Sequence, residues 1–333
     1  MNLQDIYKPI EKKLAIVESR LLAKGRGAGS PIFKTIGPLL NTGGKRLRPA
    51  LLLLAAKVCG AEGGRAIDLA VVIELIHLAS LIHDDVIDNA DLRRNVRSIN
   101  SRWGNKISIL TGDYLISLAM DLLVEHANPR VMRAVTAALR AMVTGEITQT
   151  MALHPLEMTE ARYFAIIAGK TAALTACACR VGAMLRKFRN DEAEILGQYG
   201  FNLGMAFQIT DDVLDVIGNP RELGKFVRND IREKTMTLPF IRAMSIARKK
   251  DREWMCNTFN HGPLNERALA RMTRMVRKYG GIEYSLAKVK HYADACRRRL
   301  DALDESGSRR SLALLADYIA GRAHSRLSLN PAR

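Results

Sequence analysis

The sequence contains few aromatic residues and no cysteine pattern of a metal site. Phe, Trp and Tyr make up 5% of the 333 residues, and this scarcity favours helices over strands. The five cysteines are odd in number and lack CxxC spacing, so we expect reduced thiols and a cytoplasmic location. The absence of Val- or Ile-rich alternating runs, GxGxxG and P-loop motifs argues against a nucleotide-binding α/β domain.

Targeting signals and acidic residues are also scarce. No N-terminal segment has the order of a signal peptide, and no apolar run reaches the roughly 20 residues that a membrane span needs, so we expect a soluble protein. The 34 acidic residues face 51 Lys and Arg, a net charge of +17. The basic residues are spread over many helices without a nucleic-acid motif, so no nucleic-acid partner is expected. Peripheral contact with an acidic membrane remains open.

Helical periodicity extends through nearly the whole chain. The absence of fixed-period repeats and low-complexity linkers predicts a single all-α domain over residues 1–333. The expected helices cover 6–22, 31–40, 51–58, 65 to the first acidic motif, 107–125, 129–151, 156–184, 191–217, a segment near 238, 265–279, 284–303 and 311–323.

Two acidic motifs occur inside apolar helical runs. The first lies in ELIHLASLIHDDVIDNADLRR, and the second is FQITDDVLD. Residues four apart share a helix face, so each motif gathers three carboxylates in one patch. One such motif alone is typical of a solvated acidic face, but two in apolar helices predict a cage for metal ions and a diphosphate. The six carboxylates are Asp84, Asp85, Asp88, Asp211, Asp212 and Asp215.

Basic residues near these motifs suggest anion binding. The segment NTGGKRLRP places Lys45 and Arg48 beside glycines, although a plain basic loop fits equally well. His77 lies two turns before Asp84, where a buried core histidine is the simpler interpretation. Lys170, in the small apolar segment AGKTAALTA, needs a partner, and a substrate phosphate would be one.

The ordered motifs GGKRLRP, IHLASLIHDDVIDNADLRR, TGDYLISLA, GKTAAL, GMAFQITDDVLD and TLPFI resemble the trans-isoprenyl diphosphate synthase, or polyprenyl synthetase, family. This resemblance covers most of the chain. It implies an isoprenoid synthase-like helical bundle around a deep central cavity, assembled as a homodimer. It also implies condensation of isopentenyl diphosphate with an allylic diphosphate, which releases pyrophosphate.

The resemblance assigns roles to particular residues. The six aspartates would hold Mg²⁺, about three ions with diphosphate bound. Those implied to carry the chemistry are Asp84, Asp85, Asp88, Arg93, Lys170, Asp211, Asp212 and Lys225. Those implied to contact the allylic diphosphate are Arg93, Lys170, Thr171, Gln208 and Lys225, and those implied to contact isopentenyl diphosphate are Lys45, Arg48, His77 and Arg94.

Helix geometry suggests the product length. Residues four and five positions before Asp84 are Ser80 and Ala79, which are too small to block a growing chain. An isoprene unit extends by about three residues of helix rise, and Ile76 and Ile73 come next along the face. We therefore expect a long product, about 30 carbons or more, rather than geranylgeranyl diphosphate.

Several positions depart from the family pattern. Asn95 and Arg97 replace a glycine and a proline, and the usual GKPxGND and REGK become GKFVRND and REKT, which changes positions 226, 228, 234 and 235. Such changes alter backbone freedom in loops that contact phosphate. They leave two alternatives open: a geranylgeranyl diphosphate synthase, or a partner-dependent or non-catalytic subunit that binds prenyl diphosphates.

Overall fold

The computed structural model describes residues 2–27, 29–41, 44–61, 63–93, 96–151, 157–186, 190–217, 229–260 and 264–329. The chain divides into two compact units. The first unit comprises Met1–Arg140, Leu174–Gly200 and Arg298–Leu315, and the second comprises Ala141–Ala173, Phe201–Arg297 and Ala316–Arg333. The expectation of one domain over residues 1–333 stays a prediction.

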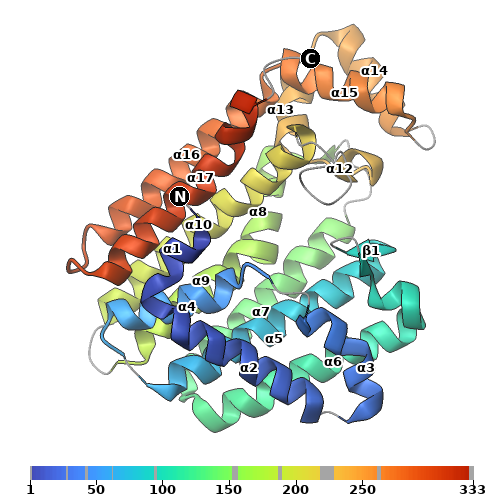
Figure 1. The fold of residues 1–333 in the computed structure, drawn as a ribbon. Helices are drawn as coiled ribbons and strands as arrows, with labels where there is room; N and C mark the ends of the chain where they lie inside the picture. Colours follow the sequence, from blue (N-terminus) through green and yellow to red (C-terminus); the bar gives the residue numbers. More distant parts are fainter. Residues whose placement is uncertain are drawn as a thin grey trace. The chain divides into compact units, whose positions relative to one another are not determined.

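The expected all-α class is confirmed (Figure 1). Within the described residues, the only strands are β1 (Leu92–Arg93) and β2 (Val96–Arg97), which form a short antiparallel pair with Leu92 opposite Arg97. This pair directly follows the first acidic motif. It therefore turns the chain back after that motif and leaves the fold class unchanged.

The elements that belong wholly to the first unit are α1 (Leu3–Tyr7), η1 (Lys8–Ile10), α2 (Glu11–Gly27), α3 (Ser30–Asn41), α4 (Leu47–Val58), α5 (Gly64–Ile87), β1, β2 and α6 (Ile99–His126). Those wholly in the second unit are α8 (Glu160–Ile167), η3 (Ala168–Ala172), α12 (Asn229–Arg232), α13 (Leu238–Ile246), α14 (Lys249–Asn260) and α15 (Glu266–Lys278). Five helices contribute residues to both units: α7 (Pro129–Thr150), α9 (Ala173–Met184), α10 (Asn190–Ile217), α16 (Gly281–Leu300) and α17 (Gly307–Leu329).

Helix α5 forms the core of the first unit. It packs against α4 and α6, and most of its residues from Ala66 to Ile82 are buried (Figure 1). At the α5–α6 contact, a Cβ on Gly112 would lie 2.2 Å from Nε2 of His83. A larger residue at position 112 would therefore require the His83 side chain to move, so the two helices pack closely near the first acidic motif.

The second unit differs from the sequence expectation in two places. The helix expected over 156–184 is divided by η3, a π-helical turn that contains Lys170 and Thr171. A π-turn widens the helix locally and is frequent at functional sites. Helix α14 was not predicted, because its charged opening KKDREW hides the apolar face formed by Met255 and Phe259, both of which are buried.

Within the part of the chain that the structure describes, three helical segments are long and apolar enough to cross a membrane by length and composition: Gly64–Ile87, Ile99–His126 and Glu160–Met184. The expectation that no run reaches that length was wrong, because scattered polar residues do not lower the mean hydropathy of these segments enough. The fold buries 72% of the apolar window in the first segment and 56% in the third, but only 39% in α6. Packing inside the protein therefore accounts for much of the apolar character of the first and third segments.

Candidate active site

The first acidic motif lies at the C-terminal end of α5. Asp84 and Asp85 are in its last turn, and Asp88 is the C-cap, whose N–H donates to the carbonyl of Asp84 at 2.8 Å. Asp85 is buried with 6% of its surface exposed, whereas Asp84 is half-buried and Asp88 is exposed. The C-terminal end of a helix already carries partial negative charge, so three carboxylates there favour a bound cation.

The chain after this motif folds back onto it. Asn100 Nδ2 donates to the carbonyl of Asp85 at 3.2 Å, and Ser98 Oγ donates to the carbonyl of Ala90 at 2.6 Å. The main chain of Arg93 lies in β1, while Arg94 and Asn95 fall outside the described residues. These contacts hold the end of α5 in a defined turn, and the roles expected of the two arginines remain predictions.

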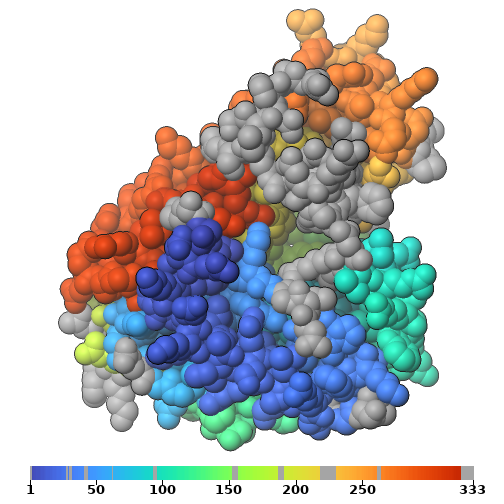
Figure 2. All heavy atoms as spheres, in the orientation of Figure 1, coloured from blue at the N-terminus to red at the C-terminus, as the bar shows by residue number. Residues whose placement is uncertain are grey.

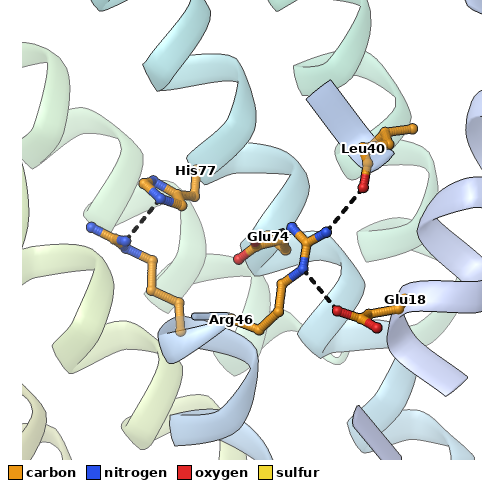
Figure 3. Close-up of polar contacts among 6 residues, drawn as sticks. Glu18, Leu40, Arg46, Glu74 and His77 are labelled. Atoms are coloured by element: carbon orange, nitrogen blue, oxygen red, sulfur yellow. Dashed lines mark hydrogen bonds and ion pairs between the residues drawn. The ribbon is translucent and has the colours of Figure 1, made fainter. Parts of the chain in front are cut away.

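A cationic corner, formed by Arg48 and His77 with Lys45 three residues before Arg48 in the chain, lies beside α5. Arg48 Nη1 is 3.0 Å from Nε2 of His77, and a dashed line in Figure 3 marks this contact. Lys45 is exposed. The adjacent Arg46 is buried and makes an ion pair of 2.8 Å with buried Glu74. The sequence analysis did not predict this pair. The signal that could have revealed it is Glu74 itself, a charged residue inside an apolar helical run that needs a basic partner when buried. Glu74 neutralises Arg46 inside the core, whereas Arg48 and His77 are only half-buried.

The accessible face of α5 leads from this corner to the first motif. His77, Ser80 and Asp84 are each half-buried, at spacings of three and four residues. Ile73, Ile76 and Ala79, expected to line the path of the growing chain, are each 0% exposed. Among the four expected length determinants, Ser80 is therefore the one that solvent reaches.

The second acidic motif ends α10 in the second unit, and its middle aspartate is held by neutral donors. Tyr163 Oη donates to Asp212 Oδ2 at 2.6 Å, and Gln208 Nε2 donates to Asp212 Oδ1 at 2.9 Å. Thr171 Oγ1 in turn donates to Gln208 Oε1 at 2.8 Å. Asp212 is 5% exposed, so both of its oxygens are satisfied inside the protein.

Burial raises the pKa of Asp212 to about 7, although the hydrogen bonds from Tyr163 and Gln208 lower it, and the nearby charges of Asp211 and Asp215 raise it further. The pKa of the Tyr163 phenol is raised well above its ordinary value, first by burial and then by the charge of Asp212. Tyr163 is therefore a hydrogen-bond donor at neutral pH. Sequence reasoning did not single it out.

The flanking aspartates have different partners. Asp211 Oδ1 is 2.8 Å from Nη1 of Arg322 on α17, and Asp215 Oδ2 accepts the N–H of Asp230 at 3.2 Å. The Arg322 guanidinium also lies 5.4 Å from the ring centroid of Phe207. Positive charge is thus already drawn to this motif from within the chain.

Lys170 has a protein partner. Its Nζ is 2.6 Å from Glu146 Oε2 and 3.5 Å from Gln149 Oε1, both on α7. The two elements touch through glycines: a Cβ on Gly145 would lie 2.8 Å from the main-chain nitrogen of Lys170. The partner that the sequence required for this lysine is therefore Glu146, while 27% of the lysine side chain stays accessible.

The expected loop residues lie mostly outside the described part of the chain, including Lys225, Phe226 and Arg228. Lys234 stands where the family pattern REGK has glycine, and its φ of 58° falls in the left-handed region that favours glycine. The N–H of Thr235 donates to the carbonyl of Asp230 at 2.7 Å. Both departures are thus accommodated within a turn, at some backbone strain on Lys234.

The donor set is suited to hard divalent cations. Within the described residues, no three His, Cys, Asp or Glu side chains gather closely enough to hold a metal by themselves. Each motif instead offers two accessible carboxylates one helical turn apart, Asp84 with Asp88 and Asp211 with Asp215. Mg²⁺ commonly takes one or two carboxylates and completes its shell with phosphate oxygens and water. The motifs belong to different units, so their convergence stays a prediction.

Proteins of known structure share this fold. A polyprenyl synthase from Caulobacter crescentus, crystallised with calcium and isoprenyl diphosphate, matches with a TM-score of 0.91 at 32% identity over 97% of this chain and 98% of that one. The fold is that of the isoprenoid synthases. The model of the polyprenyl synthetase family matches residues 31–276, and the chain belongs to that family.

Curated relatives agree on the reaction class but differ in product length. A short chain isoprenyl diphosphate synthase of Methanothermobacter thermautotrophicus is 36% identical over 86% of this chain and 89% of that protein. Component 2 of the heptaprenyl diphosphate synthase of Geobacillus stearothermophilus is 35% identical over 97% of this chain and 99% of that protein. The protein is a prenyltransferase with trans-prenyl diphosphate synthase activity.

Proposed function

We propose that the protein extends an allylic diphosphate with isopentenyl diphosphate to a long-chain polyprenyl diphosphate of about 30 carbons or more, using Mg²⁺. The observation that supports it best is the accessible face of α5, where His77, small Ser80 and Asp84 follow one another. The cationic corner, the small residue Ser80 and the first acidic motif thus lie on or beside one helix.

The acidic and basic side chains would have different roles in the reaction. Asp84, Asp88, Asp211 and Asp215 would hold Mg²⁺, which when bound stabilises the charge that develops on the departing pyrophosphate. Lys170, oriented by Glu146, adds a positive charge for the same diphosphate. Water would quench the allylic cation, so the proposed function requires apolar surroundings that exclude water from the growing chain.

Isopentenyl diphosphate would bind at the cationic corner. Arg48 presents a planar set of donors suited to phosphate oxygens, and its contact with His77 limits its freedom to rotate. Arg46 is held by Glu74 in the core and does not join this site. Lys45, which is exposed, supplies a further positive charge.

The test is a product assay. Purified protein with Mg²⁺, farnesyl diphosphate and labelled isopentenyl diphosphate is expected to give products of about 30 carbons or more, sized by reversed-phase chromatography. A product that stops at geranylgeranyl diphosphate would instead support a shorter-chain synthase. No turnover until a second protein is added would support the partner-dependent subunit, which the component name of the Geobacillus relative makes worth testing.

Assembly as a homodimer is part of the proposal. Helix α6 exposes Trp103, Ile107, Ile109 and Leu110 by 39–56%, and Figure 2 shows its turquoise beginning at the surface of the first unit. Clustered exposed apolar side chains of this size are typical of an interface. Leu110→Glu is expected to convert dimers to monomers in light scattering, and unchanged dimers would contradict this interface.

A cytoplasmic location and peripheral membrane contact complete the proposal. The five cysteines all lie in the described part of the chain and form no disulfide bond there, which is typical of a reducing compartment. A net charge of +17 favours attraction to acidic lipids close to where an apolar product would leave. Binding to anionic liposomes that disappears in high salt would support this contact, whereas absence of binding at low salt would contradict it.

A further inference from the structure

Four side chains in the second unit form one hydrogen-bonded chain that joins three elements. It runs from Tyr163 on α8 to Asp212 and Gln208 on α10, and on to Thr171 in the π-turn η3. Tyr163, Asp212 and Thr171 are 4%, 5% and 6% exposed. A buried network in which each link is made at 2.6–2.9 Å holds its members in one geometry.

In this network the three aspartates of the second motif differ in exposure, since Asp212 is buried while Asp211 and Asp215 are partly accessible. Tyr163 and Gln208 occupy the two oxygens of Asp212, one each, and turn this carboxylate into the protein. Asp211 and Asp215 remain accessible, on the same side of the helix at a spacing of four residues. Tyr163 and Gln208 do not bond to Asp211 or Asp215 themselves, but they hold the helical turn that carries both. Groups that set the orientation of metal ligands from behind are typically worth about 10- to 100-fold in metal affinity or activity.

We propose that Tyr163 is a positioning residue: its hydroxyl anchors Asp212 and thereby aims Asp211 and Asp215 at the cations that carry the allylic diphosphate. The inference rests on the proposed function and deepens it. Gln208 also accepts a hydrogen bond from Thr171, which is next to Lys170 in the π-turn η3. The Tyr163 hydroxyl therefore also helps to fix the position of the metal-binding motif relative to this turn, which would contact the diphosphate.

A purely structural role would not require a carboxylate. Tyr199, equally buried, donates to the carbonyl of Leu312 at 2.7 Å, which satisfies a core hydroxyl without burying a charge. Tyr163 instead bonds to a buried member of an acidic motif, a group that is costly to place in the core. The partner of Tyr163 therefore indicates a function beyond packing.

The test compares Tyr163→Phe with Tyr284→Phe. Tyr284 makes the same type of bond in the same unit, since its hydroxyl donates to Glu160 Oε1 at 2.6 Å, and neither residue belongs to the hydrogen-bonded chain around Asp212. Isothermal titration measures Mg²⁺-dependent binding of pyrophosphate, and thermal unfolding in EDTA measures intrinsic stability. We expect Tyr163→Phe to weaken binding about tenfold and Tyr284→Phe to leave it within about twofold.

Two results would overturn the inference: Tyr163→Phe that binds Mg²⁺ and pyrophosphate like the wild type, or Tyr284→Phe that weakens binding as much. Tyr163→Phe could fail to fold because it leaves the buried Asp212 carboxylate without its donor, and Asp212→Asn removes that charge. In that case Asp212→Asn is compared with the double variant that adds Tyr163→Phe. A tyrosine that acts through Asp212 adds no further loss there, and an additional loss of tenfold would contradict it. Failure of the wild type to bind pyrophosphate with Mg²⁺ would instead reject the proposed function.

Discussion

The two acidic motifs share a spacing but differ in how the protein supports them. In both, the second aspartate is buried, Asp85 at 6% and Asp212 at 5% exposure. The first motif ends its helix at a C-cap, and the following turn folds back to donate to the main chain at Asp85. The second lies within the last two turns of α10 and is supported by side chains from α8 and α17.

This difference shows that DDxxD describes the positions of the carboxylates and not their surroundings. Local main-chain contacts hold the first motif, which follows directly from its own sequence neighbourhood. The second motif depends on Tyr163 and Arg322, which are respectively about 50 and 110 residues away in the sequence. Changes far from the second motif should therefore alter its metal binding, whereas the first should respond mainly to changes nearby.

The largest effect is expected when an accessible aspartate is lost from either motif. Asp84→Ala and Asp211→Ala should each lower turnover by about 10²- to 10³-fold, because in the proposed function each carboxylate holds Mg²⁺ that stabilises the charge of the leaving group. Incorporation of labelled isopentenyl diphosphate measures this. Asp121→Ala, an exposed position on α6, serves as the control. Near-normal turnover in either variant would exclude that motif from the reacting site.

A bulky residue at Ser80 should shorten the product without stopping the reaction. Ser80→Phe places an aromatic ring one helical turn from Asp84, and we expect products of about 15–20 carbons. Ser80→Ala keeps the small size and should keep the long product. Product sizing distinguishes the two variants, and unchanged long products from Ser80→Phe would show that the chain grows along another face.

We expect the two buried aspartates, one in each motif, to affect the affinity for Mg²⁺ more than the turnover. Asp85→Asn and Asp212→Asn are expected to raise the Mg²⁺ concentration for half-maximal activity by about 10- to 100-fold, with a smaller change in turnover at saturating Mg²⁺. Metal titrations of the initial rate measure this. A loss of turnover that saturating Mg²⁺ does not restore would mean that these two act directly on the substrate.

The smallest effect is expected for Arg322, whose guanidinium makes an ion pair with Asp211 of the second motif. Arg322→Gln should tighten Mg²⁺ binding in the absence of diphosphate by about two- to fivefold, since an ion pair on Asp211 competes with the metal for the same oxygen. Arg297→Gln, whose Nε donates to Asp317 at 2.9 Å in the same unit, is the control. Weaker metal binding by Arg322→Gln would indicate that the role of Arg322 in holding Asp211 in place outweighs its competition with the metal.

Sequence reasoning located both motifs, most helices and the family, because helical periodicity and carboxylate spacing are local properties. It did not find the π-turn at Lys170, the helix α14 or the pairing of Arg46 with Glu74. Each of these depends on contacts between segments that are distant in the chain or on burial that composition hides.

The amino-acid sequence by itself determined where the six carboxylates lie along their helices, since a repeat of 3.6 residues per turn decides which side chains share a face. The tertiary structure alone decided which of them turn inward. Asp212 is an anchor because Tyr163 and Gln208 converge on it, and Lys170 has Glu146 as its partner because glycines let two elements touch. Hydrogen bonds and burial arise between segments, and no local pattern encodes them.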